Sequence, residues 1–225
     1  MNKHFTRYVE IVGFSLLLFF TGYGLLMAGK GQEAFMEWLR EDGLVENLTA
    51  LFLLGSSAVG VYRSIGHYRV KAWKPMITWS VVAFLFFFGA GEEISWGQRI
   101  FEIETPGFFA EKNIQNEMNL HNLVIGGVKV NMLVFSQMLF GVLAIYLLLL
   151  RPLASKLSWV NRLLGDFQVP LARWTYVVIW LVFMGIVNMI NLVKAGELYE
   201  FIFSVMFLVI FLNPFFILPK NRKLS

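Results

Sequence analysis

Long apolar runs alternate with shorter polar stretches along the whole chain, and this alternation predicts the fold. A membrane-spanning helix needs about 20 mostly apolar residues, and six segments of the chain meet that length. We therefore predict an all-α polytopic membrane protein, a single domain over residues 1–225, with six transmembrane helices at 9–28, 45–65, 75–94, 131–150, 174–193 and 198–218. The last two segments are separated by only four residues, so they are expected to form a tight antiparallel hairpin.

Two of the polar stretches predict interfacial helices. In 29–44, Phe35, Trp38 and Leu39 fall at helical spacing, with charged residues elsewhere on the turn. This pattern is typical of a helix that lies on a membrane surface. A second short helix is expected from about 113 to 123, where a dense polar cluster follows the third predicted span.

The composition agrees with this reading and excludes several kinds of chemistry. Hydrophobic residues make up 57% of the chain and charged residues only 15%, whereas soluble domains carry about a quarter of charged residues. No polar interval is long enough for a separate soluble domain. The chain has no cysteine, which excludes disulfides, thiolate metal sites and cysteine nucleophiles.

The distribution of charge predicts the orientation of the spans. If the N-terminus lies inside, 13 of the 19 Lys and Arg residues fall in the inner segments 1–10, 62–74, 151–173 and 219–225. Of the 15 acidic residues, 13 fall on the outer side. An excess of Lys and Arg marks cytoplasmic loops, so both termini are predicted to be cytoplasmic (N-in, C-in). The expected partners are membrane lipids, with a second copy of the chain or another membrane protein as a further option, and no nucleic acid.

The stretch from Glu92 to Arg99 is the first candidate site. It follows an apolar run at 79–90, and two adjacent carboxylates at the end of such a run suggest a function. On a continuous helix, Glu92 and Arg99 share a face, so these two are predicted to pair. Glu93 points about 100° away, since successive helical residues differ by that angle, and is left for another partner. The alternative is that both acids are solvated among the lipid headgroups, with Trp96 in an aromatic belt.

The polar cluster at 113–122 is the second candidate site. Glu117 and His121 are four residues apart on the expected helix, and histidine can act as acid, base or ligand near neutral pH. We predict Glu92, Glu93 and His121 as catalytic residues. Substrate binding is assigned to Arg99, Asn119 and Asn122. The alternative for His121 is a hydrogen-bonded histidine in an interfacial loop.

A metal site is a further expectation at the outer face. Its predicted ligands are Glu46, Glu93, His121 and Glu200, which come from four separate segments. The other two histidines belong to the inner side, so an all-histidine zinc site is excluded there. The cofactor that fits is a divalent metal with mostly oxygen ligands. For acids at helix starts, the alternative is a favourable interaction with the helix dipole.

Three strings in the sequence carry a resemblance to known proteins. EDGLVENLTALFLL (41–54), GEEISWGQRIF (91–101) and NLHNL (119–123) resemble a bacterial family of small polytopic membrane proteins. That resemblance implies a multi-pass protein of the bacterial inner (plasma) membrane and no particular activity. The first string also resembles the acidic motif of alkaline-ceramidase-like membrane hydrolases. Those hydrolases use seven spans and three histidines around zinc, so their catalytic site is not carried over to this chain.

Three functions are compatible with these residues. The first is an intramembrane enzyme that acts on a lipid or lipid-linked substrate. Glu92 or Glu93 would then be the general base, His121 the general acid and Arg99 the anchor for an anionic headgroup. The second is a cation or proton channel or transporter, although no series of acids crosses to the inner side. The third is a non-catalytic membrane subunit that binds a partner through its outer loops.

Overall fold

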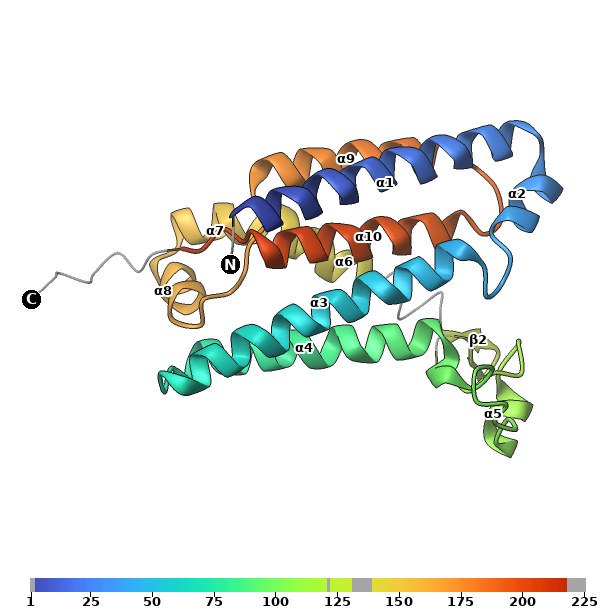
Figure 1. Ribbon diagram of the computed structural model, residues 1–225, viewed down its shortest axis with the longest axis horizontal. Coiled ribbons are helices and arrows are strands. Elements are labelled where there is room, and N and C mark those ends of the chain that lie inside the picture. The colour runs from blue at the N-terminus through green and yellow to red at the C-terminus, as the bar shows by residue number, and fades with distance from the viewer. Residues whose placement is uncertain (1–2, 121, 131–138, 218–225) are drawn as a thin grey trace, which may run out of the picture.

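The computed structural model describes residues 3–120, 122–130 and 139–217 (Figure 1). It is 74% helix with almost no strand, which confirms the predicted helical class. The elements in chain order are α1 (Lys3–Gly29), α2 (Gln32–Trp38), α3 (Leu44–Arg69), α4 (Trp73–Glu93), the 3₁₀ helix η1 (Ser95–Gly97), α5 (Gly107–Lys112), β1 (Val124–Ile125), β2 (Val128–Lys129), α6 (Leu139–Ala144), the π-helix η3 (Ile145–Leu149), α7 (Leu150–Lys156), α8 (Ser158–Asp166), α9 (Trp174–Asn188) and α10 (Ala195–Leu212).

Four of the described helices, α1, α3, α4 and α10, are long and apolar enough to cross a membrane. A fifth span results if Gly141–Lys156 and Ser158–Asp166, which meet at an angle of 118°, are taken as one broken span. At 15 residues, α9 is shorter, and a rise of 1.5 Å per residue makes it about 22 Å long. Residues 131–138 of the fourth predicted span lie outside the described residues. Several apolar helices thus indicate a membrane protein, and the count of six spans stays a prediction.

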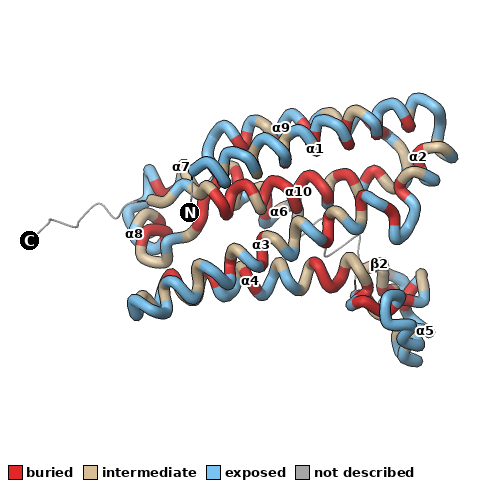
Figure 2. Tube along the Cα trace, viewed as in Figure 1, coloured by how far each residue is buried: buried red, intermediate tan, exposed pale blue. Residues whose placement is uncertain are grey.

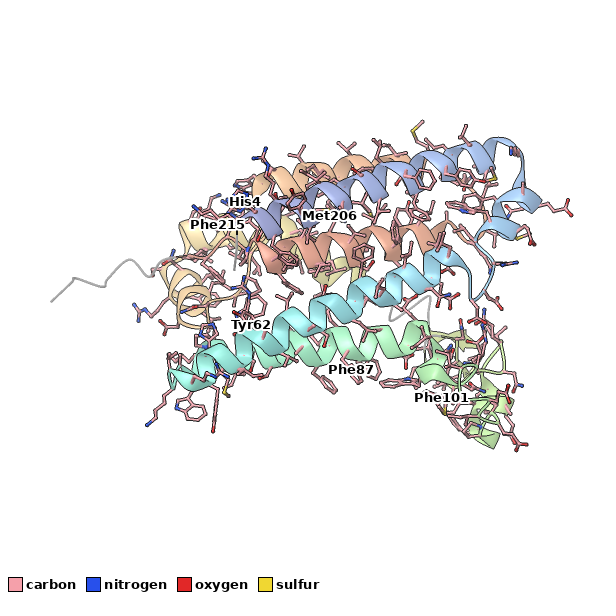
Figure 3. All side chains as sticks on the ribbon, in the orientation of Figure 1. His4, Tyr62, Phe87, Phe101, Met206 and Phe215 are labelled. Atoms are coloured by element: carbon pink, nitrogen blue, oxygen red, sulfur yellow. The ribbon has the colours of Figure 1, made fainter. Side chains whose placement is uncertain are left out.

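Helix α10 is the centre of the bundle. It packs against α1, α3 and α9, and Figure 1 shows it between the α1–α9 layer and the α3–α4 layer. In its most apolar 18-residue stretch 61% of the residues are buried, against 33% in α1, α3 and α4 (Figure 2). The other helices expose large apolar side chains instead; Phe87 of α4, for example, is 53% exposed and points away from the bundle (Figure 3). Exposed apolar surface of this extent suits contact with lipid.

Helices α3 and α4 approach each other through small residues. A Cβ atom added to Gly60 would lie 2.8 Å from the backbone nitrogen of Ala83. Beside it, the Ser57 hydroxyl donates a hydrogen bond to the Ala83 carbonyl at 2.8 Å. Small residues and interhelical hydrogen bonds of this kind hold helices together where lipid removes the hydrophobic driving force.

The helical bundle has two distinct ends. At one end, α7 and α8 lie beside the start of α1 and the α3–α4 turn (Figure 1), and Lys74 forms an ion pair with Asp166 at 2.8 Å. At the other end lie α2, α5 and the β1–β2 hairpin, where Lys194 donates a hydrogen bond to the Leu39 carbonyl at 3.2 Å. Among the described residues, the predicted inner segments 3–10, 62–74 and 151–173 therefore gather at one end. The predicted outer segments gather at the other, which we call the outer end.

The prediction of two interfacial helices in the outer loops is only partly correct. Helix α2 forms within 29–44, but Phe35 is fully buried and its ring lies 6.0 Å from that of Trp38. Its apolar side therefore packs on protein rather than on a membrane surface. The helix expected at 113–123 does not form, and a bridge between Asn113 and Leu123 closes a loop instead. The amide oxygen of Asn113 accepts two backbone N–H groups of this loop, which is how Asn side chains compete with helix formation.

Candidate functional site

The chain turns sharply where α4 ends at Glu93. Ser95 and Trp96 both take positive φ angles, 47° and 55°, a backbone region that non-glycine residues rarely adopt. The turn carries the Trp96 ring over Gly91, where an added Cβ would lie 2.8 Å from the ring. Helical spacing therefore stops at Glu93, and the face predicted to continue through the following residues does not exist.

Glu92 anchors the polar loop to the end of α4. Its side chain is buried, with 3% exposure. One carboxylate oxygen accepts the indole N–H of Trp96 at 2.9 Å, and the other accepts the backbone N–H of Leu120 at 2.6 Å. The predicted pair of Glu92 with Arg99 is wrong, because the turn after α4 redirects Arg99 toward other carboxylates.

Arg99 connects two parts of the chain that are distant in sequence. Its guanidinium forms ion pairs with Asp42, in the turn before α3, and with Glu117, in the polar loop. The Arg99 side chain keeps 37% exposure. Both of these ion pairs are with protein carboxylates, and the side chain as a whole is only partly covered.

Glu117 lies in a buried network of three side chains. The Ser95 hydroxyl donates to its carboxylate at 2.5 Å, and the amide of Asn119 donates to the same oxygen at 2.8 Å. The Asn119 amide also donates to the Ser95 hydroxyl at 2.9 Å. With 1% exposure, Asn119 supports the loop and does not face solvent. We call the following residues the polar cap: Glu92, Ser95, Arg99, Glu117 and Asn119.

Amide side chains complete the fold of this loop. The Asn113 amide donates to the side-chain oxygen of Asn119 at 2.9 Å, and the backbone N–H of Asn122 donates to the same oxygen at 3.2 Å. The amide of Asn122 in turn donates to Gln115. Because buried polar groups are costly unless hydrogen-bonded, these contacts fix the loop in one conformation. The richness of this segment in Asn and Gln was the sequence signal for it.

A group of acids surrounds Glu93, which is only partly buried. The charges of Glu46 at the start of α3, and of Glu197 and Glu200 at the start of α10, act on Glu93. Glu46 also accepts the backbone N–H of Asp42 at 2.7 Å, a contact typical of a helix N-terminus. The structure thus brings together Glu46, Glu93 and Glu200, three of the four residues predicted as metal ligands.

The fourth predicted ligand, His121, lies outside the described residues. Within the described residues, no three acidic or histidine side chains form a group that could hold a metal ion. The carboxylates near Glu93 interact through space without converging on one point. The metal site therefore stays a prediction, and the structure shows a set of acids whose charges act on Glu93.

A second polar cluster, partly buried, lies at the opposite end of the bundle. The Tyr176 hydroxyl donates to the carboxylate of Glu10, and the Asn213 amide donates to the same carboxylate oxygen at 2.7 Å. Arg173 donates to the side-chain oxygen of Asn213 at 2.9 Å. Sequence reasoning missed this cluster, and the only signal for it was that Glu10 is an acid among basic inner residues. The cluster joins α1, α9 and the end of α10.

Comparison of the chain with family models, with curated proteins and with solved structures gives no match.

Proposed function

We propose that this chain is a six-span protein of the bacterial inner membrane with cytoplasmic termini, and that it acts as an enzyme on a lipid or lipid-linked substrate at its outer end. The separation of basic and acidic segments to opposite ends of the bundle supports the orientation. The observation that carries the enzymatic function is the position of Glu93. Within the part of the chain that the structure describes, Glu93 has no hydrogen bond or ion pair, although neighbouring carboxylates act on it.

The polar cap and Glu93 have different roles in this proposal. The carboxylates of the polar cap are held by hydrogen bonds and ion pairs, so they keep the outer loop in place. In this proposal the carboxylate of Glu93, at the end of the candidate span α4, is available to a lipid headgroup. A general base needs an available carboxylate within reach of the proton that it removes. Glu93 is therefore the proposed base, and Glu92 becomes a positioning residue.

Four further residues have proposed roles together with Glu93. The charges of Glu46 and Glu200 both disfavour a charged Glu93, so a divalent cation, a cationic substrate or a proton at Glu93 would offset their repulsion. His121 is the proposed general acid. Arg99, whose side chain is partly exposed, is the proposed contact for an anionic headgroup.

The test is a comparison of membrane lipids in a strain from which the gene has been deleted. The strain is complemented with wild type, Glu93→Gln, His121→Ala, the double variant, or Glu37→Gln, an exposed acid of the same end. Lipid species are measured by mass spectrometry, and each variant is checked for expression and thermal stability. We expect wild type and Glu37→Gln to restore the lipid profile. Glu93→Gln and His121→Ala should fail although folded, and the double variant should be no worse, since residues that act as a unit are not additive.

Two results would contradict the enzymatic function. The first is a lipid profile that deletion leaves unchanged. The second is full complementation by Glu93→Gln. That result would favour the alternative, in which Glu93 is a solvated acid among the lipid headgroups.

A cation or proton channel or transporter is the second candidate, and the clustering of acids at one mouth of the bundle favours it. Rings of acids at a mouth concentrate cations. Purified protein in liposomes containing a pH-sensitive dye distinguishes the two functions. Proton or K⁺ flux in wild type that is lost in Glu93→Gln would support transport, whereas wild type without flux would favour the enzyme.

A further inference from the structure

Helix α8 has three different faces, and one of them is apolar but uncovered. Val160 and Leu164 are buried in a small core with Ala154 and Leu171. Trp159, four residues before Leu163, is 65% exposed, and Leu163 is exposed beside it. One face of α8 thus holds the helix to the protein, while the next offers apolar side chains to the surroundings.

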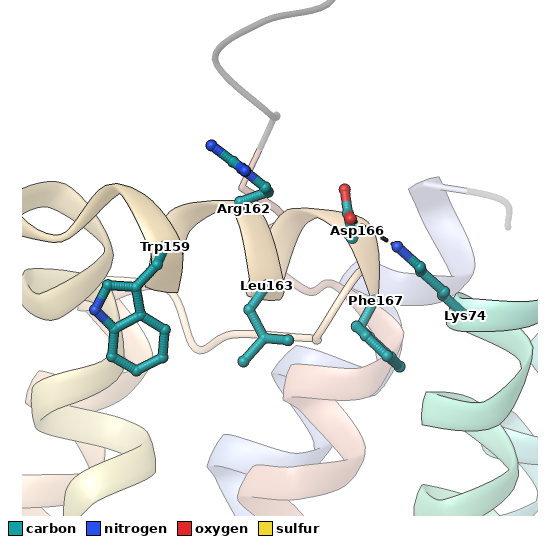
Figure 4. A pocket seen from close by; sticks show the side chains of 6 residues that line it. All are labelled: Lys74, Trp159, Arg162, Leu163, Asp166 and Phe167. Atoms are coloured by element: carbon teal, nitrogen blue, oxygen red, sulfur yellow. Dashed lines mark hydrogen bonds and ion pairs between the residues drawn. The ribbon is translucent and has the colours of Figure 1, made fainter.

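The third face of α8 is charged. Figure 4 shows Arg162 and Asp166 on one side of the helix, and Trp159, Leu163 and Phe167 on the other. The spacing of four residues within each pair, 159 with 163 and 162 with 166, produces this division. A helix with such faces lies in the plane of a membrane interface, with its apolar side toward the acyl chains.

A cleft lies between α8 and the start of α4. Its volume is about 240 Å³, and its walls are formed by Lys74, Trp159, Arg162, Leu163, Asp166 and Phe167 (Figure 4). Two contacts fix its width. Lys74 pairs with Asp166 at 2.8 Å, and the Thr78 hydroxyl donates to the Phe167 carbonyl at 2.8 Å.

The two basic residues at the cleft differ in whether they can bind a ligand. The Lys74 ammonium is engaged by Asp166. Arg162 is exposed and forms no ion pair within the described part of the chain. A free guanidinium above an apolar wall matches a phosphate group joined to acyl chains, because guanidinium binds phosphate oxygens through paired N–H groups.

We propose that this cleft binds an anionic phospholipid of the leaflet at the α7–α8 end of the bundle. Arg162 contacts the headgroup phosphate, and Lys74 contributes positive charge while paired with Asp166. Trp159 and Leu163 contact the upper part of an acyl chain. The site is separate from the acids around Glu93, which lie at the opposite end of the bundle.

The probe is purified full-length protein in a non-ionic detergent, titrated with phosphatidylglycerol or phosphatidylcholine. Lipid retention is measured by native mass spectrometry and thermal stabilisation in parallel. We expect preferential binding of phosphatidylglycerol. One basic residue near an anionic lipid contributes about 1 kcal/mol, so Arg162→Gln should weaken phosphatidylglycerol binding about fivefold. Trp159→Ala should weaken retention of both lipids.

Two further variants sharpen the test. Asp166→Asn removes a negative charge and releases Lys74, so it should strengthen binding of phosphatidylglycerol, a gain that a purely structural role would not give. Arg69→Gln, an exposed basic residue of the same end outside the cleft, should bind as wild type. Equal retention of the two lipids, an unchanged affinity in Arg162→Gln, or an equal loss in Arg69→Gln would overturn the assignment. Displacement of phosphatidylglycerol by inorganic phosphate alone would also overturn it, because the contacts with the acyl chains would then contribute nothing to the binding affinity.

Discussion

The guanidinium of Arg99 forms an ion pair with the buried carboxylate of Glu117. The two residues belong to the same outer segment, but Arg99 also reaches Asp42 at the start of α3. The Arg99 guanidinium therefore joins the polar loop to the turn that precedes α3. The outer end of the bundle is stabilised by charge as well as by apolar packing.

Arg99→Gln is expected to destabilise the outer end by about 1–3 kcal/mol, because it leaves a buried carboxylate without its cation. The measurement is the thermal midpoint of purified protein in detergent. Glu117→Gln should cost a similar amount, and the double variant should cost less than the sum, since the two residues act on one contact. Arg40→Gln, an exposed arginine of the same end, is the control. Additive losses in the double variant would show that the pair contributes nothing of its own.

Gly60→Ala is expected to weaken the contact between α3 and α4. The new methyl group would meet the Ala83 backbone at 2.8 Å, and such overpacking typically costs about 1–3 kcal/mol. Gly66→Ala on the same helix meets nothing within 4 Å and should be neutral or slightly stabilising, because alanine favours a helix over glycine. Thermal midpoints of the two variants are compared. Equal midpoints would mean that the two helices are not held this closely in the membrane.

Tyr176→Phe tests the cluster at the opposite end. The change removes the hydroxyl that donates to Glu10 and keeps the ring, so a loss of about 1 kcal/mol is expected from the hydrogen bond. Tyr8→Phe changes a tyrosine that is 70% exposed on the same end of α1 and should have no effect. Both are measured by thermal unfolding in the same detergent. Wild-type stability in Tyr176→Phe would indicate that the cluster does not join α1 to α9.

The orientation of the chain is open to a direct test with reporter fusions. Fusions after Lys74 and Arg162 should report a cytoplasmic position, because both residues belong to the Lys- and Arg-rich segments. A fusion after Glu104, in the acidic loop, should report an external position. The readout is paired alkaline phosphatase and fluorescent protein activity. An external signal after Lys74 would reverse the orientation, and the site around Glu93 would then face the cytoplasm.

The long apolar helices could be predicted from the sequence because their signal is local. Helices α1, α3, α4 and α10 cover most of the predicted runs at 9–28, 45–65, 75–94 and 198–218. Each run depends on the apolar character of consecutive residues, which lipid demands wherever the segment packs. The end of α4 was also placed within one residue, where the first carboxylates interrupt the run.

The details of the outer end could not be predicted because they depend on tertiary contacts. If α4 continued as a helix, Glu92 and Arg99 would share a face and could pair. Instead, positive φ angles at Ser95 and Trp96 turn the chain away from the axis of α4. That conformation is stabilised in part by the indole of Trp96 donating to Glu92. The second partner of Arg99, Asp42, lies in the turn before α3, and no spacing rule connects the two. The sequence allowed us to predict that acids from separate segments lie at one end of the bundle. It did not allow us to predict which residues form hydrogen bonds or ion pairs with them.

The central position of α10 has a consequence for how the protein is made. Ribosomes synthesise α10 after α1, α3, α4 and α9, yet α10 is the helix against which α1, α3 and α9 pack. Helices α1 and α9 must therefore remain in the bilayer, or with an insertion chaperone, without their main partner until α10 is made, whereas α3 already packs against α4. Premature termination before Ala195 would therefore leave α1, α9 and the α3–α4 pair without the helix that joins them.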